Sequence, residues 1–597
     1  MKDIPKAKTW TLLKKLSPKN SIDPPAAKKD KYGNLITSQE CIKDLYIETY
    51  KNRLKPNTLT DDTSELKDLK EYLFSLQMSL ARSNISKDWT LTDLEKVLKS
   101  LKNNKARDEH GLTYELFKYG GTSLKLSLLK LFNSIKSKQV YPKILQKSNI
   151  TSFWKKKGDK LDLDNERGVF NVSKVRSILD KLIYNDIYSV VDSHMSCSNL
   201  GARKHRNIRE HLFVINAIIN DVCNSKDNQE IDIQLYDVAK CFDKLEYTNT
   251  AIDFFNAGVQ DDKFVLVSNS NKSCDVAIKT PFGLTERTTF SNIEMQGTVL
   301  AGLKCSISID SIGKETLQNK HHRLYKYKNS VSIPPLSFID DIINVAYCSP
   351  DSVKACATTK AKIAGKQLEL GSKKCFQIHV GKPNSQCSTT LKINDTKMQK
   401  ASSERYLGDI ISADNKRDTH INDRYNKGIS YVNQILSILK EISFGFYYFE
   451  QAMQLRNAKL INGILCSVEA LYGLTSAHVE KLERCDSYFF RKIFNAPKTT
   501  PTESFYLETS ALPIRFVIIG RRLLFYWNIL NKPESELIKK VYRIQKLRPV
   551  RNDWCSTIAE DLKNAEIDLT ETEIASMKES TFKSLVNQNV QQDICLV

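Results

Sequence analysis

The stretch Pro335-Leu-Ser-Phe-Ile-Asp-Asp-Ile-Ile-Asn-Val-Ala346 places two adjacent acids, Asp340 and Asp341, inside an apolar run. The residues on both sides are typical of β-strands, so the pattern predicts a hairpin with the acids at its bend. Carboxylates that leave water cost free energy unless they are paired or bind a cation. The stretch therefore predicts a sheet edge that presents two acids to a positive ion.

A second strand is predicted a hundred residues earlier. Glu230-Ile-Asp-Ile-Gln-Leu-Tyr-Asp-Val238 alternates between apolar and polar residues, and Asp237 lies at its end. If the two strands are neighbours, three carboxylates meet at one edge, where a hard divalent cation such as Mg²⁺ suits the oxygen ligands. Two such ions about 3.5–4 Å apart can activate a 3′-hydroxyl and stabilise a leaving pyrophosphate. A single aspartate here is more often a cap or turn residue; the adjacent pair favours metal binding.

Composition narrows the class of protein. The chain has 597 residues, which predicts three or four packed units, and its hydrophobic fraction of 41% argues against general disorder. Lys and Arg number 90 against 69 Asp and Glu, a formal charge of +21. Nucleic acid is the favoured polyanionic partner, although a Lys-biased solvated surface is the simpler alternative. The sequence contains neither a membrane-length apolar run nor a signal peptide, so we expect an intracellular protein without a membrane partner.

Five segments are predicted along the chain. Residues 1–62 are expected to be a basic flexible arm, with a nonspecific phosphate contact as a further role. Residues 63–230 begin with an apolar stripe typical of a helix and with a capping box at Thr92–Glu95. Residues 231–412 carry the strands described above, and a helical pattern runs from Gln296 to Leu317. Residues 413–500 and 501–597 are predicted to be helical, and the role of the last segment is open.

The 14 cysteines are scattered without a Cys-x-x-Cys pair. In an intracellular chain such cysteines are usually reduced core thiols. The histidines show no metal-ligand spacing either. The sequence therefore predicts neither a disulfide framework nor a zinc ribbon.

Nine motifs in order resemble one enzyme family. Five of them are Tyr236–Asp243, Met295–Leu300, Phe338–Asp341, Lys374–Gly381 and Arg405–Gly408. They resemble palm motifs A to E of reverse transcriptases, in the version found in non-LTR (LINE-type) retrotransposons. Four upstream segments resemble the fingers motifs of the same family: Lys102–Leu112, Trp154–Asp159, Asn165–Val169 and Gly201–Lys204. The resemblance covers about residues 85–500; each motif is weak alone, and their order makes the signal strong.

The resemblance implies a role for each matching position. Asp237, Asp340 and Asp341 would be the catalytic, metal-binding triad, and the Val238 carbonyl would complete a coordination shell. Phe242 would lie under the incoming ribose and favour deoxynucleotides, with a core phenylalanine as the alternative.

Other positions would contact the nucleotide, the phosphates or the primer. Gln296 and Gly297 would pack beneath template and nucleotide, where glycine permits close backbone approach. Arg203, with Arg167 and Lys181 as weaker candidates, would bind phosphate through the guanidinium fork or the ammonium; a plain surface role is as good an alternative for Arg167 and a better one for Lys181. Lys374 would donate a proton to pyrophosphate, with a surface lysine as an equal alternative. The primer-grip hairpin would be formed by Tyr406, Leu407 and Gly408.

Three positions depart from the family pattern. Ile339 stands where a small residue precedes the acid pair, Ala301-Gly302 stands where a Ser-Pro pair is common, and Ala202 stands where an aromatic is usual. These departures bear on activity and fidelity more than on the fold, because all three carboxylates remain.

The resemblance implies an α+β right-hand polymerase with fingers over 63–230, an antiparallel palm sheet over 231–412 and a helical thumb over 413–500. Its expected activity is RNA-directed DNA synthesis with two Mg²⁺ ions, or Mn²⁺ in their place, on an RNA template with a DNA primer and deoxynucleoside triphosphates. Nuclear localisation is implied by the family alone, and the oligomeric state is open.

An RNA-dependent RNA polymerase is disfavoured by Phe242. A polymerase-derived RNA-binding protein without catalysis and a poorly folding pseudogene product are the alternatives. No endonuclease pattern is evident, so a fragment, a degraded copy or a stand-alone polymerase are all compatible with the sequence.

Overall fold

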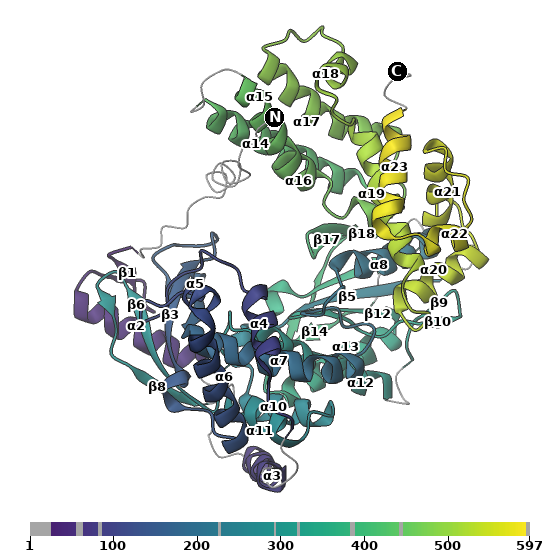
Figure 1. Cartoon of the computed structure of the whole chain (residues 1–597). Helices are drawn as coiled ribbons and strands as arrows, with labels where there is room; N and C mark the ends of the chain where they lie inside the picture. The colour runs from purple at the N-terminus through teal and green to yellow at the C-terminus, as the bar shows by residue number, and fades with distance from the viewer. Residues whose placement is uncertain are drawn as a thin grey trace.

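The computed structural model describes residues 25–54, 64–80, 86–224, 229–291, 294–318, 323–381, 389–440 and 446–592. The chain is a mixed α and β protein in which two five-stranded sheets are surrounded by helices (Figure 1). This agrees with the α+β class expected from the sequence. No helix in the described part of the chain is long and apolar enough to cross a membrane.

The central sheet contains the predicted acidic strands. Its strand order is β11-β12-β5-β13-β16, and only the last pair is parallel. The strands are β5 (Ile231–Asp237), β11 (Leu336–Phe338), β12 (Asp341–Tyr347), β13 (Phe376–Val380) and β16 (Gln399–Lys400). The predicted hairpin is confirmed as β11–β12, and β5 lies directly beside β12. Two segments a hundred residues apart are therefore neighbours in one sheet.

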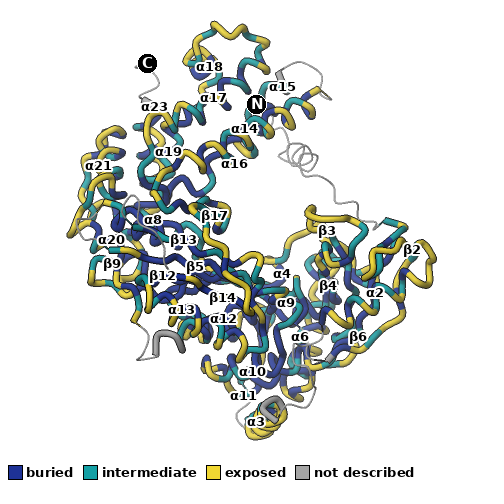
Figure 2. Tube along the Cα trace, turned by 180° about the vertical axis from the view of Figure 1, so that it is seen from behind, coloured by how far each residue is buried: buried dark blue, intermediate teal, exposed yellow. Residues whose placement is uncertain are grey.

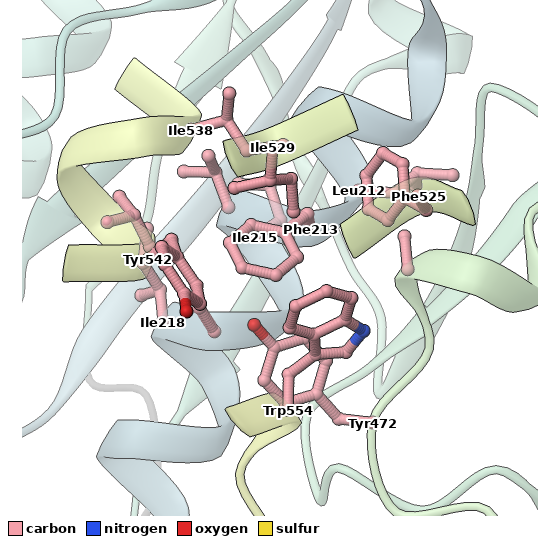
Figure 3. Packing of buried hydrophobic residues seen from close by; sticks show 14 of the residues in the cluster. Leu212, Phe213, Ile215, Ile218, Tyr472, Phe525, Ile529, Ile538, Tyr542 and Trp554 are labelled. Carbon is pink, nitrogen blue, oxygen red and sulfur yellow. The ribbon is translucent and has the colours of Figure 1, made fainter. Parts of the chain in front are cut away.

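One face of the central sheet packs against α8 (Ile208–Asn224) and the C-terminal helices. Figure 3 shows how α8 and these helices pack together. Those helices are α19 (Ile514–Leu530), α20 (Leu537–Leu547), α21 (Trp554–Asn564), α22 (Glu571–Ser576) and α23 (Glu579–Gln592). The rings of Phe213 and Trp554 meet edge to face with centroids 5.1 Å apart. The C-terminal segment is thus part of the core that covers the sheet, a role that the helical pattern alone did not indicate.

The other face packs against α12 (Ala301–Gln318) and α13 (Asp351–Gly365). The turn at Gly297 precedes α12, so this helix begins at Ala301, whereas the predicted helical run opened at Gly297 and already included Val299. The positive φ of +98° at Gly297 explains the difference, because a left-handed residue interrupts a right-handed helix.

A second, N-terminal sheet has the order β4-β3-β6-β7, with β8 also paired to β6. Its strands are β3 (Lys147–Trp154), β4 (Glu166–Val172), β6 (Ser273–Thr280), β7 (Gly283–Leu284) and β8 (Thr288–Ser291). Helix α2 (Gln39–Leu54) contacts this sheet through Tyr46 and Tyr50, which are buried.

Residues 25–54 therefore differ from the predicted flexible arm. They form β1 (Lys28–Lys29), β2 (Leu35–Ile36) and α2. Lys28 is fully buried in an ion pair with Glu166, and Arg53 donates to the Leu163 carbonyl at 2.6 Å. Lys28 and Arg53 thus have buried acceptors for their charged groups. A basic segment can be buried when its charges are paired in this way. Residues 1–24 and 55–62 of the predicted arm lie outside the described residues.

Helices pack around the N-terminal sheet and between the two sheets. They are α3 (Ser64–Leu80), α4 (Leu91–Ser100), α5 (Tyr114–Tyr119), α6 (Gly121–Lys138), α7 (Lys174–His194), α10 (Tyr247–Asn256) and α11 (Asp261–Asn269). The helix predicted after residue 63 is present. The capping box of α4 is formed by Thr90 and Asp93, two residues before the predicted Thr92 and Glu95. In a capping box the side chain at the third helical position accepts a hydrogen bond from the N-cap amide. Asp93 does this here as a glutamate would.

A separate group of helices stands at one end of the molecule, next to the C-terminal helices (Figures 1 and 2). It comprises α14 (Asp418–Leu439), α15 (Phe446–Leu455), α16 (Asn462–Ile464), α17 (Ser476–Phe494) and α18 (Thr502–Thr509). Phe490 is fully buried and its ring stacks on Phe505 with centroids 5.7 Å apart. Phe490 on α17 thus belongs to the core of this helical group.

Candidate active site

The three predicted acids meet at one edge of the central sheet. Asp237 ends β5 and Asp341 begins β12, and the two are direct register partners across the antiparallel pair. Such partners have Cα atoms only about 4.5–5.5 Å apart. Asp340 lies in the adjoining turn, and its carbonyl accepts the Val238 amide at 3.4 Å. The topology thus brings Asp237, Asp340 and Asp341 together with the Val238 backbone.

The turn that carries Asp340 is short and strained. Phe338 pairs with Asp341, which leaves two residues in the turn, and the first, Ile339, has a φ of +62°. A β-branched residue in the left-handed region is rare and costs about 1–3 kcal/mol. The departure from the family pattern at Ile339 therefore falls at a strained backbone position beside the acids.

A neighbouring loop supports this hairpin. The Leu200 amide donates to the Ser337 carbonyl at 3.0 Å, and the Ser337 amide donates to the Ser198 carbonyl at 3.0 Å. Gly201 comes so close that a Cβ atom there would lie 2.5 Å from the Ile339 nitrogen. Only glycine fits at that approach, so residues 198–201 hold the turn in place.

The electrostatics of the edge favour a cation. Burial raises the pKa of Asp341 to about 6, and the charges of Asp340 and Asp237 add to the shift. Burial also raises the pKa of Asp340, with Asp237 contributing. Among the described residues these acids form one ion pair, with Lys374, whose Nζ lies 3.0 and 3.1 Å from the two oxygens of Asp237. Lys374 is 67% exposed, and ion pairs of that kind contribute little.

The edge opens into a cavity of about 600 Å³. Seven of the predicted site residues line it: Arg167, Asp237, Val238, Phe242, Gln296, Asp340 and Lys374. Asp341 and Gly297 adjoin residues of this lining without being part of it. The cavity thus joins segments that resemble different motifs of the family.

Further basic residues line the same cavity and were not singled out from the sequence: Lys155, Lys240 and Lys373. Lys155 belongs to the motif Trp154–Asp159, and Lys373 precedes Lys374, so those motifs contained the signal. Among the described residues Arg167 makes no ion pair, and it is exposed on β4 toward the cavity. A carboxylate edge facing several cations is suited to a ligand that brings both metal and phosphate.

Phe242 and Gln296 both line the cavity. Phe242 lies on α9 (Cys241–Lys244), is half-buried and packs on the core beneath the cavity. The Gln296 carbonyl accepts the Phe170 amide at 3.0 Å, which fixes this turn to the N-terminal sheet. A Cβ atom on Gly297 would lie 3.1 Å from Val169, so glycine permits the close approach that was expected there.

Arg203 lies elsewhere, with its donors engaged. It is 9% exposed; its Nε donates to Asp192 at 2.7 Å, and its remaining nitrogens donate to the carbonyls of Ser196, Asn199 and Asp192. This guanidinium braces the loop after α7 and is not presented to a phosphate, contrary to the expectation for Arg203. Lys181 lies 4.2 Å from the ring centroid of Tyr184 and does not line the cavity. Sequence position alone could not separate a bracing arginine from a ligand-binding one.

Tyr406, Leu407 and Gly408 form the predicted hairpin. Strands β17 (Ser403–Tyr406) and β18 (Asp409–Ser412) pair around Leu407 and Gly408, whose φ values are +47° and +88°. Two left-handed residues are typical of the tight turn that matches strand twist. The Tyr406 hydroxyl is buried against His211 Nδ1 at 3.2 Å, so its ring stabilises the hairpin from inside. Contact with a primer stays a prediction.

The acid edge, its cavity and the nearby hairpin are thus built from segments spread over more than two hundred residues. The cavity lining combines carboxylates with lysines and Arg167. A scan against protein-family models finds no model that matches this chain.

Proposed function

We propose that this chain is an RNA-directed DNA polymerase of the non-LTR retrotransposon type, which adds deoxynucleotides to a primer 3′-end. The observation that carries the proposal is the pairing of Asp237 with Asp341 across β5 and β12, with Asp340 in the adjoining turn, at the edge of a cavity that lysines and an arginine also line. Few other chemistries call for three carboxylates beside phosphate-binding cations.

The residues present fit Mg²⁺, with Mn²⁺ as the alternative. All the candidate ligands are oxygens, namely the carboxylates of Asp237, Asp340 and Asp341 and the Val238 carbonyl, and Mg²⁺ is usually held by few carboxylates and completed by substrate phosphates. Two bound ions would lower the pKa of the attacking 3′-hydroxyl and balance charge on the leaving pyrophosphate. The raised pKa of Asp341 is consistent with a site that ionises fully only beside a cation.

The other cavity residues divide the remaining tasks. Arg167, Lys155 and Lys373 bind the triphosphate, for which the guanidinium fork of Arg167 is best suited. Phe242 supports the ribose and excludes a 2′-hydroxyl, which favours deoxynucleotides. Lys374 leaves Asp237 when the cation binds and then is free to donate a proton to pyrophosphate. A volume of about 600 Å³ is in the range of small-molecule sites.

The architecture accords with this assignment. The central sheet within residues 231–412 serves as the palm, residues 63–230 supply the fingers, and α14–α18 correspond to a thumb. The formal charge of +21 suits a heteroduplex, and binding is expected to weaken steeply as salt rises.

A polymerase-derived RNA-binding protein without catalysis is the second candidate. Two observations favour it: Lys374 already pairs with Asp237 in the absence of metal, and Ile339 strains the turn that carries Asp340. Both functions predict RNA binding, so only nucleotide incorporation separates them.

The test is primer extension on poly(rA)·oligo(dT) with dTTP and Mg²⁺. The full chain is expected to extend the primer, and Asp340→Asn is expected to abolish extension while retaining RNA binding. Asp568→Asn, a change of the same kind at an exposed acid in the C-terminal segment, is the matched control and is expected to keep activity. Tight RNA binding without any incorporation by the unmodified chain would favour the second candidate.

A further inference from the structure

A second cluster of metal-ligand side chains lies at the far end of the central sheet. One oxygen of Glu230, the sulfur of Cys348 and a ring nitrogen of His379 lie within 4.8 Å of one another. Asp232 adjoins them, with an oxygen 3.2 Å from His379 Nδ1. Asp232 precedes Asp237 by five residues on β5, about 16 Å along an extended strand, so this cluster is separate from the candidate active site.

The register of three strands explains why these four residues meet. His379 on β13 is the direct partner of Asp232 on β5, and Ala346 on β12 is its partner on the other side. Cys348 comes two residues after Ala346, and its amide donates to the Glu230 carbonyl at 3.4 Å. Since alternate residues of a strand share a face, all four side chains project from the same face of the sheet.

Two of the distances match those between ligands of one tetrahedral zinc ion. Zn–N, Zn–O and Zn–S bonds of about 2.05, 2.1 and 2.3 Å, at tetrahedral angles, place N and S about 3.6 Å apart and N and O about 3.4 Å apart. The observed distances from His379 Nδ1 are 3.5 Å to the Cys348 sulfur and 3.2 Å to the Asp232 oxygen. A hydrogen bond from His379 Nδ1 would account for one of these two contacts. One N–H cannot point along both directions at once, so the second contact is left without a hydrogen bond from this nitrogen.

Burial adds an independent observation. The His379 side chain is 11% exposed and Asp232 is fully buried. The other ring nitrogen, Nε2, is buried and makes no hydrogen bond among the described residues; Glu230 Oε2 lies 3.8 Å from it. His379 also lines a cavity of about 850 Å³ together with Cys223 and Asn224.

We propose that Asp232, Cys348 and His379, with Glu230 as the outer ligand, form a binding site for a zinc-class divalent cation. A thiolate and an imidazole select Zn²⁺ over Mg²⁺, so the site is distinct in chemistry as well as in place from the carboxylate edge. A bound ion would link the ends of β5, β12 and β13 and fix the register on which the Asp237–Asp341 pairing depends. The proposal does not rest on the proposed polymerase function.

The geometry is less suited to a nucleophilic cysteine. An activated thiol needs one imidazole nitrogen for itself while an acid orients the other. Here Cys348 and Asp232 face the same nitrogen of His379, so the ring lies among ligands and does not form a relay between them.

The test is Co²⁺ titration of the full chain after dialysis against a chelator. We expect one equivalent to give the visible bands of tetrahedral cobalt and a thiolate-to-cobalt charge-transfer band, with excess Mg²⁺ not competing. Cys348→Ser should remove the charge-transfer band. His379→Gln should weaken binding by more than about 100-fold, because even outer-shell partners account for 10–100-fold.

Cys223→Ser is the matched control. Cys223 lines the same cavity, but its thiol is directed at the Ala413 carbonyl at 3.5 Å, so this variant should keep the full cobalt spectrum. Far-UV circular dichroism checks that each variant folds, and Cys348→Ala replaces Cys348→Ser if the latter does not. The absence of a charge-transfer band in the unmodified chain, or its persistence without Cys348, would show a hydrogen-bonded histidine only and overturn the proposal. None of these readouts involves nucleotide incorporation.

Discussion

Removing one charge from the acid edge should stabilise the chain when no metal is present. Asp341 has a pKa raised to about 6, chiefly by burial and then by the charges of Asp340 and Asp237. A carboxyl that holds its proton more tightly in the folded state makes folding less favourable as the pH rises from about 4 through 6. Above that window the loss is constant, and Asp341→Asn removes it while keeping the shape of the side chain.

The size of the effect follows from the shift. A rise from 3.8 to about 6 corresponds to an upper bound of about 3 kcal/mol at 1.36 kcal/mol for each pH unit. Because Asp341 keeps some contact with solvent, about 1–2 kcal/mol is the more realistic gain at pH 7.5. For 597 residues that unfold as one unit, with an unfolding entropy of about 2.1 cal/mol/K per residue, this raises Tm by about 1–2 °C.

The assay is thermal unfolding in a chelator at pH 7.5 and at pH 4.5, with Asp568→Asn as the control for loss of an ordinary surface charge. Asp341→Asn should melt above the unmodified chain at pH 7.5, and the difference should shrink at pH 4.5. Adding Mg²⁺ should stabilise the unmodified chain at pH 7.5 and leave Asp341→Asn nearly unchanged. A variant that melts at or below the unmodified chain at pH 7.5 would refute the assignment of mutual repulsion to these acids.

Three further predictions concern other parts of the site and the core. Lys374→Met should lower the Mg²⁺ concentration for half-maximal stabilisation by about two- to five-fold, because the lysine competes with the cation for Asp237. The same variant should slow primer extension. A higher Mg²⁺ requirement in a melting titration would contradict this. Gly201→Ala should destabilise the chain by about 1–3 kcal/mol and lower extension, because its Cβ would lie 2.5 Å from the Ile339 nitrogen; unchanged melting would show that the loop yields freely. Trp554→Ala should cost about 3–5 kcal/mol in denaturant unfolding, because the ring is fully buried under the central sheet; a cost below about 1 kcal/mol would mean that the C-terminal helices pack independently.

Local patterns predicted the acid strands well. Alternation defined β5, and the acid pair between β-like runs defined the β11–β12 hairpin, because both features are properties of neighbouring residues. The motif order then indicated which distant segments to bring together, and Arg167, Phe242, Gln296 and Lys374 do line one cavity with the acids.

What failed depended on partners that a single sequence does not reveal. Lys28 looked solvated because its buried partner, Glu166, is more than a hundred residues away. Arg203 looked like a phosphate ligand, yet its donors bind carbonyls of its own loop and Asp192. Cys348 and His379 showed no ligand spacing because only the pairing of three strands brings them together.

The shared core of α8, the central sheet and α19–α23 has a consequence for synthesis on the ribosome. Ile233 and Ile343 on the sheet share an apolar cluster with helices α19–α23, which are translated about 170 residues or more after Ile343. Until those helices have been synthesised, the nascent chain exposes an apolar surface of the sheet. Such a surface binds chaperones and makes the chain prone to aggregation. A recombinant fragment intended to carry the acid edge should therefore extend through α23 rather than stop after α17.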